Sequence, residues 1–306
     1  MDYTVCAIVT DPNGVADIDG VYVDIYYPEN IAFHEDANNP DDPAHADYGE
    51  LGCGAFIEEN ELLPLPKMDG YNLFCGTIKN DNNNLPKFFP MPTGGDYNYD
   101  EICGATGELM KETAKVYCDD KDLTWEDPAG NYRVEVFAQD KVGNFSYTDP
   151  AKADIDYNEF TYLEAQGYDI DFTAINYGEV ALNSHKIISG DLTWGNNVPS
   201  IRNTGNVRLY ISINQDDMGL GKVGTTWNVK YDARIGNEQL DWKWYWPEVN
   251  TKLEDILDLS EIEEMDFSVL ITKFPSISAT YTGVMDLSAD KAVFRQCLPQ
   301  DNHLSP

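Results

Sequence analysis

Short segments in which apolar and polar residues alternate dominate this chain, and they constrain its fold more than any other feature. The alternation is clearest in residues 5–9, 132–138 and 207–213, and residues 21–27 are β-branched and aromatic. Successive side chains of a strand point to opposite faces, so a period of two predicts strands with one buried face. Several short strands separated by Asp, Asn, Gly and Pro are typical of β-sandwiches. The sequence therefore predicts an all-β fold with few short helices.

The length of the chain, 306 residues, predicts two domains, because one domain usually contains about 100–200 residues. Charged and small residues at 149–158 indicate a linker. We therefore expect two Ig-like β-sandwich domains, at residues 1–152 and 153–306. The first is expected to contain a long insertion over about residues 34–118, which includes much of a polar loop at 29–52.

Three segments carry more specific expectations about secondary structure. Residues 71–78 are expected to form a strand, and residues 252–264 are expected to form one or two helical turns with an acidic outer face. For residues 107–115 a short helix and a strand both fit the pattern. The alternation of Ala114, Val116 and Cys118 favours the strand.

The charge balance of the chain is strongly acidic. Fifty-four Asp and Glu residues oppose twenty Lys and Arg residues, so the formal net charge at pH 7 is −34. Such a chain repels phosphate backbones and anionic lipid headgroups, which excludes nucleic acid and membrane surfaces as expected partners. No stretch reaches about 18 consecutive apolar residues, so no membrane-spanning helix is expected. The acidity has two interpretations, a solvated surface or clustered carboxylates that hold divalent cations such as Ca²⁺.

The number and spacing of the cysteines predict disulfides. They lack the C-x-x-C spacing of zinc sites, and the four histidines lie far from them in the sequence. An even count in a chain of this composition indicates disulfides and hence an oxidising, extracellular compartment. Cys103–Cys118 is the first expected pair and Cys53–Cys75 the second. The six cysteines are Cys6, Cys53, Cys75, Cys103, Cys118 and Cys297.

The N-terminal strand around residues 5–9 is the expected contact between copies, because no element precedes it to cover its edge. Cys6 and Cys297 lie far in sequence from the other four cysteines, and two alternatives stay open for them. They bond each other, or they link successive subunits. The first residues show no basic region followed by an apolar one, so the signal peptide of an exported protein is expected outside this chain.

Two passages carry a resemblance to a known group of proteins. Residues 130–144, GNYRVEVFAQDKVGN, resemble the last strands of bacterial and archaeal Ig-like surface modules, in which G-x-Y-x-V-x-V-x-A-x-D-x-x-G-N is typical, and residues 10–18 look like their first turn. Residues 201–207 and 214–219 resemble a strand pair in surface proteins of methanogenic and related archaea. The chain is thus similar to the S-layer, sheath or extracellular-fibre proteins of such archaea.

This resemblance implies a non-catalytic structural protein of the cell surface. Its expected partners are further copies of itself, in a surface layer, sheath or filament, together with other envelope proteins or glycans. The alternative function is that of an adhesin or carbohydrate-binding surface module, and a third is that of a hydrolase.

No sequence motif of catalysis supports the hydrolase. The chain contains none of the G-x-S-x-G, H-E-x-x-H, P-loop or dinucleotide-binding patterns. Pairs of carboxylates suited to glycoside hydrolysis arise by chance among 54 acidic residues, so they carry no information. We therefore expect neither enzymatic activity nor a cofactor, apart from structural Ca²⁺.

The candidate Ca²⁺ ligands are the acidic residues that follow the first strand. Asp11, Asn13, Asp17 and Asp19 resemble an acidic Ca²⁺ loop but lack the regular oxygen spacing and the bidentate Glu of an EF-hand. A turn between two strands explains the same residues, and it is the favoured interpretation. Weaker candidates of the same kind lie at residues 119–122 and 216–217.

The segment 241–246, DWKWYW, is the most specific surface feature. In a strand Trp242, Trp244 and Trp246 share one face. A buried core is the favoured interpretation, and an assembly interface and a glycan-stacking platform are the alternatives.

Asn144 begins an N-x-S sequon, Asn144-Phe145-Ser146. Glycosylation and a purely structural role in the Gly-Asn turn are both consistent with that position.

Overall fold

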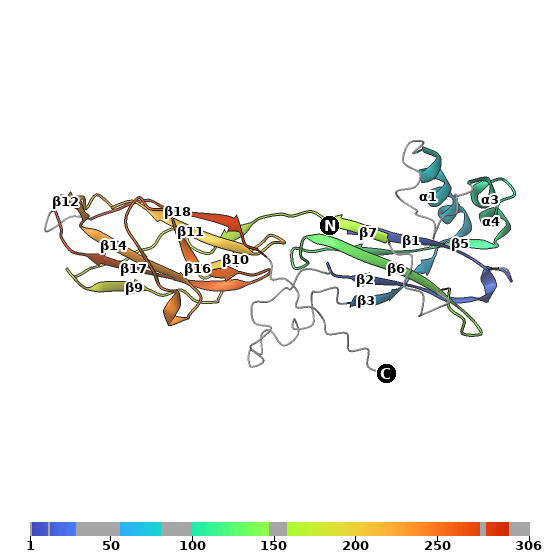
Figure 1. Ribbon diagram of the computed structural model, residues 1–306, viewed down its shortest axis with the longest axis horizontal. Coiled ribbons are helices and arrows are strands. Elements are labelled where there is room, and N and C mark those ends of the chain that lie inside the picture. The colour runs from blue at the N-terminus through green and yellow to red at the C-terminus, as the bar shows by residue number, and fades with distance from the viewer. Residues whose placement is uncertain are drawn as a thin grey trace.

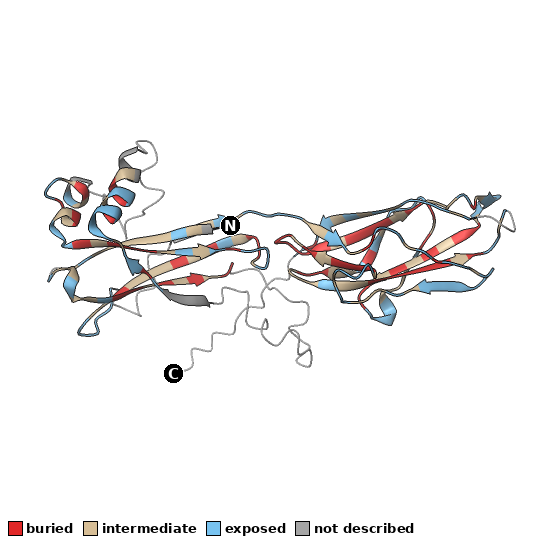
Figure 2. Ribbon diagram, turned by 180° about the vertical axis from the view of Figure 1, so that it is seen from behind, coloured by how far each residue is buried: buried red, intermediate tan, exposed pale blue. Residues whose placement is uncertain are grey.

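The computed structural model describes residues 2–11, 13–28, 56–80, 99–146, 158–275 and 280–293. The protein consists mostly of β-strands, whose sheets stack in sandwich-like fashion in two lobes that lie end to end (Figure 1). The predicted all-β fold is thereby confirmed. Buried residues lie between the stacked sheets of each lobe, and in the first lobe also between a sheet and the helices that cover it (Figure 2). Among the described helices none has the length and apolarity needed to cross a membrane.

The first lobe stacks two sheets. The smaller has the strand order β1-β5-β4 and the larger the order β3-β2-β6-β7. Their bounds are β1 (Asp2–Thr10), β2 (Ile18–Tyr26), β3 (Phe56–Glu61), β4 (Leu63–Pro64), β5 (Ala114–Asp122), β6 (Gly130–Asp140) and β7 (Asn158–Tyr162). Strand β7 follows the expected domain boundary at residue 152, yet it pairs with β6. The first sheet system therefore extends to Tyr162 and not to residue 152.

Alternation along the strands builds the core of the first lobe. Val21, Val23 and Ile25 of β2 point inward, and Tyr132 and Val134 of β6 meet them from the neighbouring strand. Aromatic rings join the two sheets, because Phe160 of β7 stacks on Tyr132 at 5.1 Å between centroids and contacts Tyr3 of β1 at the same distance.

Three helices cover the outer face of the smaller sheet (Figure 1). They are α1 (Lys67–Asn80), α3 (Tyr99–Cys103) and α4 (Glu108–Lys111). The strand predicted at residues 71–78 was wrong, because this segment lies within α1. The spacing of Tyr71, Phe74 and Cys75, which pack against β5, fits one face of a helix. Gly70 permits the close approach, since a Cβ there would lie 3.0 Å from Val116 Cβ.

Both expectations for residues 107–115 hold in part. Helix α4 occupies residues 108–111, and the favoured strand begins at Ala114 as β5. The alternation in β5 separates two environments. Val116 and Cys118 face the helices, whereas Tyr117 faces the core between the sheets.

Among the described residues, two disulfides brace the first lobe. Cys6 of β1 bonds Cys118 of β5, directly opposite it in the strand register, with 4.2 Å between the Cα atoms. Cys75 of α1 bonds Cys103 of α3. The expected pair Cys103–Cys118 was wrong, because residues distant in sequence become neighbours when β1 pairs with β5.

These bonds also settle three other expectations. Neither Cys53–Cys75 nor Cys6–Cys297 forms, because Cys75 and Cys6 have other partners. A link between subunits through Cys6 is excluded for the same reason. Cys53, Cys297 and the polar loop 29–52 lie outside the described residues.

The second lobe also stacks two sheets. One has the order β15-β14-β17-β10-β8, with β9 paired to β17, and the other has the order β16-β11-β18. A hairpin of β12 and β13 stands apart from them. The bounds are β8 (Tyr168–Ile170), β9 (His185–Ile188), β10 (Ser200–Asn203), β11 (Leu209–Gln215), β12 (Lys222–Val223), β13 (Thr226–Trp227), β14 (Val229–Ile235), β15 (Lys243–Tyr245), β16 (Thr251–Leu257), β17 (Ile262–Ile271) and β18 (Met285–Lys291).

The helical turns predicted at residues 252–264 were wrong. The segment forms β16 and the start of β17, which are joined by a turn with Ser260 at φ 60°. Leu253 and Leu257 are four residues apart, a spacing that suits a helix, but both also point inward from β16. Pairing with β11 overrides the local preference, and a shift of register between Tyr210 and Ser212 accommodates it.

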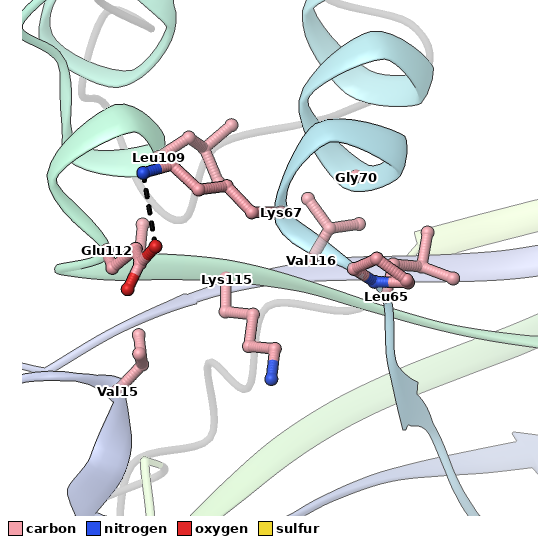
Figure 3. A pocket seen from close by; sticks show the side chains of 10 residues that line it. Val15, Leu65, Lys67, Gly70, Leu109, Glu112, Lys115 and Val116 are labelled. Atoms are coloured by element: carbon pink, nitrogen blue, oxygen red, sulfur yellow. Dashed lines mark ion pairs between the residues drawn. The ribbon is translucent and has the colours of Figure 1, made fainter.

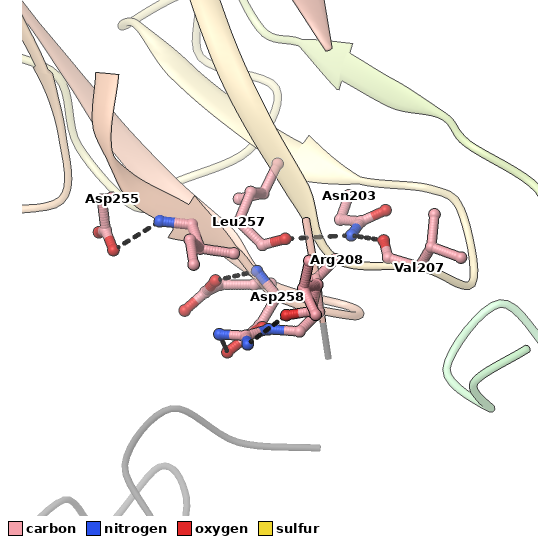
Figure 4. A network of polar contacts seen from close by, with 9 residues as sticks. Asn203, Val207, Arg208, Asp255, Leu257 and Asp258 are labelled. Carbon is pink, nitrogen blue, oxygen red and sulfur yellow. Dashed lines mark hydrogen bonds and ion pairs between the residues drawn. The ribbon is translucent and has the colours of Figure 1, made fainter. Parts of the chain in front are cut away.

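The two lobes contact each other through a small interface. Ala129 of the first lobe packs against the core of the second, and its N–H donates to the Asn206 carbonyl over 2.9 Å. Leu259 of the second lobe packs against the core of the first. Next to this interface Arg208 and Asp258 form a buried ion pair (Figure 4). The Asp258 N–H in turn donates to Glu261 Oε2 over 2.5 Å.

Glu261 makes this junction sensitive to pH. Burial, followed by the charges of Glu263 and Asp258, raises the pKa of Glu261 well above its ordinary value. The folded protein therefore holds the Glu261 proton more tightly than the unfolded chain does. The stability that this proton contributes is complete below the unfolded pKa and is lost as the pH rises through the folded pKa.

We predict that Glu261→Gln raises the melting temperature at pH 7 and flattens the decline of stability above the ordinary Glu pKa. The amide cannot ionise and still offers an oxygen to the Asp258 N–H. Thermal unfolding over a pH series measures this, with exposed Glu179→Gln as the control. A parallel shift of both variants would contradict the prediction.

We also predict that non-reducing peptide mapping recovers Cys6–Cys118 and Cys75–Cys103. Chain entropy predicts that Cys75→Ala with Cys103→Ala costs about 3.5 kcal/mol and Cys6→Ala with Cys118→Ala about 5 kcal/mol, since the second bond closes the longer loop. Urea unfolding of the two double variants measures this order. Recovery of a Cys103–Cys118 peptide would overturn the assignment.

Candidate functional site

The tryptophans of residues 241–246 lie on the outer face of the larger sheet in the second lobe. Tyr245 points inward, is buried and stacks on Tyr231 at 5.5 Å between centroids. Trp244 points to the opposite side and is 53% exposed. Trp242 and Trp246 flank β15 and are half-buried. The favoured interpretation of this row as buried core was therefore wrong, because Tyr245 supplies the core side chain.

Cations and a neighbouring ring hold the indoles in place. The Lys230 ammonium lies 4.1 Å from the centroid of the Trp244 ring, and the Arg234 guanidinium lies 5.1 Å from that of Trp242. Trp246 meets Trp244 nearly perpendicularly, at 81° and 6.0 Å between centroids. The aromatic surface is thus pre-organised.

Polar side chains continue this face across the sheet. Asp232 of β14 lies opposite Trp244 on one side and Ser268 of β17 on the other, and Ser268 lies opposite Ile187 of β9. His185 Nδ1 lies 3.0 Å from Ser268 Oγ and 3.3 Å from Asp232 Oδ2. Burial raises the pKa of Asp232, while the charges of His185 and Lys230 lower it. We call this surface, formed by β15, β14, β17 and β9, the tryptophan face.

His185, Ser268 and Asp232 do not form a catalytic relay in this arrangement. A serine nucleophile requires its hydroxyl on one imidazole nitrogen and the carboxylate on the other. Here both oxygens lie beside Nδ1 of His185. The geometry instead fixes the orientation of the imidazole ring.

The candidate Ca²⁺ ligands near the N-terminus act as turn residues. Asp11 Oδ1 accepts the Asn13 N–H over 2.6 Å, and the Lys141 ammonium bonds the Ala16 carbonyl over 2.6 Å. Within the described part of the chain no three His, Cys, Asp or Glu side chains converge as a metal site would require. Asp11, Asp17 and Asp19 are therefore not gathered into such a group, and Ca²⁺ binding by these residues and Asn13 stays a prediction.

The two weaker acidic candidates likewise have structural partners. Asp216 accepts the N–H groups of Met218 and Val284 over 2.9 and 3.0 Å, and Asp217 accepts those of Gly219 and Gly221. Residues 119–122 lie in β5, where Lys121 pairs with Asp119 over 2.7 Å and Thr4 donates to Asp120. These carboxylates hold loops and strands together.

The sequon at Asn144 lies in the hairpin turn after β6. Asn144 Nδ2 donates to Asp140 Oδ2 over 2.7 Å, and this hydrogen bond lowers the pKa of Asp140. Ser146 Oγ accepts the Ala138 N–H over 2.8 Å. Both polar side chains of the sequon therefore stabilise the turn, and glycosylation of Asn144 stays a prediction.

A cavity of about 240 Å³ lies between α1, α4 and β5 (Figure 3). Leu65, Leu109 and Val116 line its apolar part, and an ion pair of 3.1 Å between Lys67 and Glu112 lies at its edge. Lys67 and Glu112 are bound to each other at this edge. The cavity therefore has fewer polar groups available to a ligand than the tryptophan face has.

Sequence reasoning missed His185, Lys230 and Asp232. A signal for two of them is present in β14, whose sequence VKYDARI alternates strictly. Lys230, Asp232 and Arg234 therefore share the face opposite the buried residues, and a partner strand with tryptophans on that face would lie beside them.

Comparisons with known proteins give little further guidance. No family model and no curated protein matches the chain. Among solved structures, the CupB6 tip adhesin from Pseudomonas aeruginosa is 9% identical with a TM-score of 0.28, over 94% of this chain and 86% of that one. The C-terminal domain of the Streptococcus pyogenes antigen I/II-family protein AspA is 13% identical with a TM-score of 0.20, over 97% and 90%. Likeness at this level carries no argument for a shared function.

We predict that two adjacent substitutions in β15 reduce the stability of the protein to very different extents. Tyr245→Ala should destabilise the protein by about 3–5 kcal/mol, as expected for a buried aromatic residue, while Trp244→Ala should cost less than about 1 kcal/mol. Urea unfolding of both variants measures the difference. Equal losses would show that the tryptophans form part of the core.

Proposed function

We propose that this chain is a non-catalytic, extracellular structural protein of a cell surface, whose copies assemble by strand addition at the edge of β1. The observation that carries the proposal is the open backbone edge of this strand. The disulfides support an oxidising compartment. Assembly of the S-layer, sheath or fibre kind fits the resemblance of residues 130–144 to bacterial and archaeal Ig-like surface modules and that of residues 201–207 and 214–219 to archaeal surface proteins.

The strand register identifies which backbone groups of β1 are open. β1 ends its sheet, and β5 is its one partner there within the described residues. The 4.2 Å between the Cα atoms of Cys6 and Cys118 marks a non-hydrogen-bonded pair, since hydrogen-bonded pairs lie about 5.5 Å apart. The N–H and C=O groups of Thr4, Cys6 and Ile8 therefore point away from β5. In the described part of the chain they have no hydrogen-bond partner.

This edge is rigid, and no described strand covers it. Tyr3, Val5 and Val9 pack against the core between the sheets, and Ile8 packs beneath the helices. Residues 2–10 contain no proline, lysine or arginine, the residues with which natural proteins block edge strands. A fixed template loses little entropy when a strand is added to it.

The type of pairing determines the product. Two copies of β1 related by a two-fold axis would close into a dimer, whereas a different strand of the neighbouring copy would continue the assembly. We propose the second mode, which yields a homopolymer. Other envelope proteins and glycans would contact the sides of such a polymer.

The test uses two variants of one exposed residue. Thr4→Pro removes the outward N–H, whereas Thr4→Ala keeps it, and both lose the bond of the Thr4 hydroxyl to Asp120 over 2.7 Å. We predict polymers for the wild type and Thr4→Ala and monomers for Thr4→Pro. Analytical ultracentrifugation and electron microscopy measure assembly, and thermal unfolding verifies the fold. If Thr4→Pro fails to fold, Thr4→Lys takes its place in the test. It places a charge at the edge and should also block assembly.

Unchanged assembly of folded Thr4→Pro would overturn the role of β1. A wild-type monomer at high concentration would overturn the structural function and leave the adhesin or carbohydrate-binding alternative in its place. A closed dimer that Thr4→Pro abolishes would support the edge and contradict the polymer.

A further inference from the structure

We infer that the tryptophan face binds the end of a neutral oligosaccharide, with Trp244 and Trp246 as the surfaces on which the terminal sugar packs. This site is separate from the assembly edge, because it lies on the second lobe whereas β1 belongs to the first (Figure 1). The inference therefore goes beyond the structural role.

The exposure of Trp244 requires an explanation. An indole has the largest apolar surface of any side chain, and Trp244 leaves 53% of its surface in solvent although the next residue, Tyr245, is buried. Ile187, which ends the same row of outward side chains on β9, is 52% exposed. Cationic and aromatic neighbours fix the indoles, so their exposure is part of the folded structure and does not arise from a loose segment.

The arrangement of groups matches the chemistry of a sugar. A pyranose ring presents an apolar face of C–H groups, which stacks on an aromatic ring, and a rim of hydroxyl groups. The aromatic corner lies at one end of the face, and the backbone of β9 lies three strand spacings, about 14 Å, away. The His185 ring reaches back from β9 to within 3.3 Å of Asp232, which lies opposite Trp244. With Nδ1 beside Asp232 and Ser268, Nε2 of His185 has no partner in the described part of the chain. Nε2 is thus available to a hydroxyl.

The charges of the face indicate a neutral ligand. Lys230 lies over Trp244, and Arg234 is bound to Asp266 through two nitrogens, at 2.8 and 2.6 Å. These cations are already neutralised or stacked, and the net charge of −34 opposes an anionic ligand. A protein partner fits less well, because protein interfaces place their apolar residues at the centre, where this face has the half-buried Asp232 and the buried Ser268 beside it.

The angle between the two indole rings indicates which part of an oligosaccharide binds. Flat polysaccharide ribbons stack on aromatic rings that lie in one plane. Trp244 and Trp246 stand at 81° to each other and form a corner. Such a corner surrounds one sugar on two sides, which selects a chain end over the middle of a ribbon. The remainder of the oligosaccharide then crosses Asp232 towards His185.

The experiment measures binding of the full chain to an array of neutral oligosaccharides, acidic oligosaccharides, cellulose and chitin, followed by titration of the best ligand by tryptophan fluorescence. We expect binding to neutral oligosaccharides, with an affinity that rises from mono- to trisaccharide. Trp244→Ala should weaken binding at least ten-fold. Trp227→Ala, which removes an indole stacked under Lys222 on the β12–β13 hairpin, is the matched control and should leave binding unchanged.

His185→Ala provides a second, independent readout. It should weaken binding of trisaccharides several-fold and binding of monosaccharides less, because His185 lies beyond Asp232 from the corner and not within it. Thr4→Pro should not change binding, which separates this inference from the assembly proposal.

Several outcomes would overturn the inference. They are binding to no neutral oligosaccharide, a preference for acidic ligands or flat ribbons, and equal losses in Trp244→Ala and Trp227→Ala. Loss of self-association in Trp244→Ala without loss of sugar binding would assign the face to contacts between copies instead.

Discussion

The pairing of β1 with β5, closed by Cys6–Cys118, is the constraint on which the first lobe depends. It fixes the strand register, and the register determines the direction in which each side chain and each backbone N–H and C=O of β1 points. Odd-numbered side chains enter the core between the sheets, even-numbered ones face the helices or solvent, and half of the backbone groups point outward. A shift by one residue would exchange all three sets. The pairing that this bond closes therefore determines both the side chains that enter the core and the backbone groups that point outward.

The same period of two governs the second lobe, in whose described residues no disulfide lies. Tyr245 and Trp244 are neighbours in sequence, yet one completes the core and the other faces solvent. Pairing with β14 decides between them, because Tyr245 lies opposite Tyr231, which is buried, and Trp244 lies opposite Asp232. Composition alone favours burial of tryptophan. Only the identity of the partner strand shows which aromatic side chain enters the core.

Local alternation predicted many of the strands. Features that depend on pairing between distant residues could not be predicted from the sequence. Residues 114–122 and 130–140 are strands as their period indicates, and the overall β fold follows from many such segments. Helix α1 was missed because the apolar residues of this segment can be recognised as one face of a helix only once β5 is known to pack against them. The disulfide partners, the position of β7 and the contacts of His185 depend on pairs distant in sequence. The sequence singled out the tryptophans, but their exposure could not be predicted without strand order.

The distribution of charge explains which surfaces remain for recognition. In the second lobe, several cations lie over aromatic rings, so a chain with few basic residues uses them to support its own structure. These pairs are Arg202 with Trp194, Lys222 with Trp227, Lys230 with Trp244, Arg234 with Trp242 and Lys252 with Tyr210. Two kinds of surface are left, a backbone edge and aromatic rings, and neither acts through net charge. Contacts of both kinds depend little on salt concentration. The assembly and the sugar binding that we propose therefore do not rely on attraction between charges, which a strongly acidic surface could not supply to copies of itself.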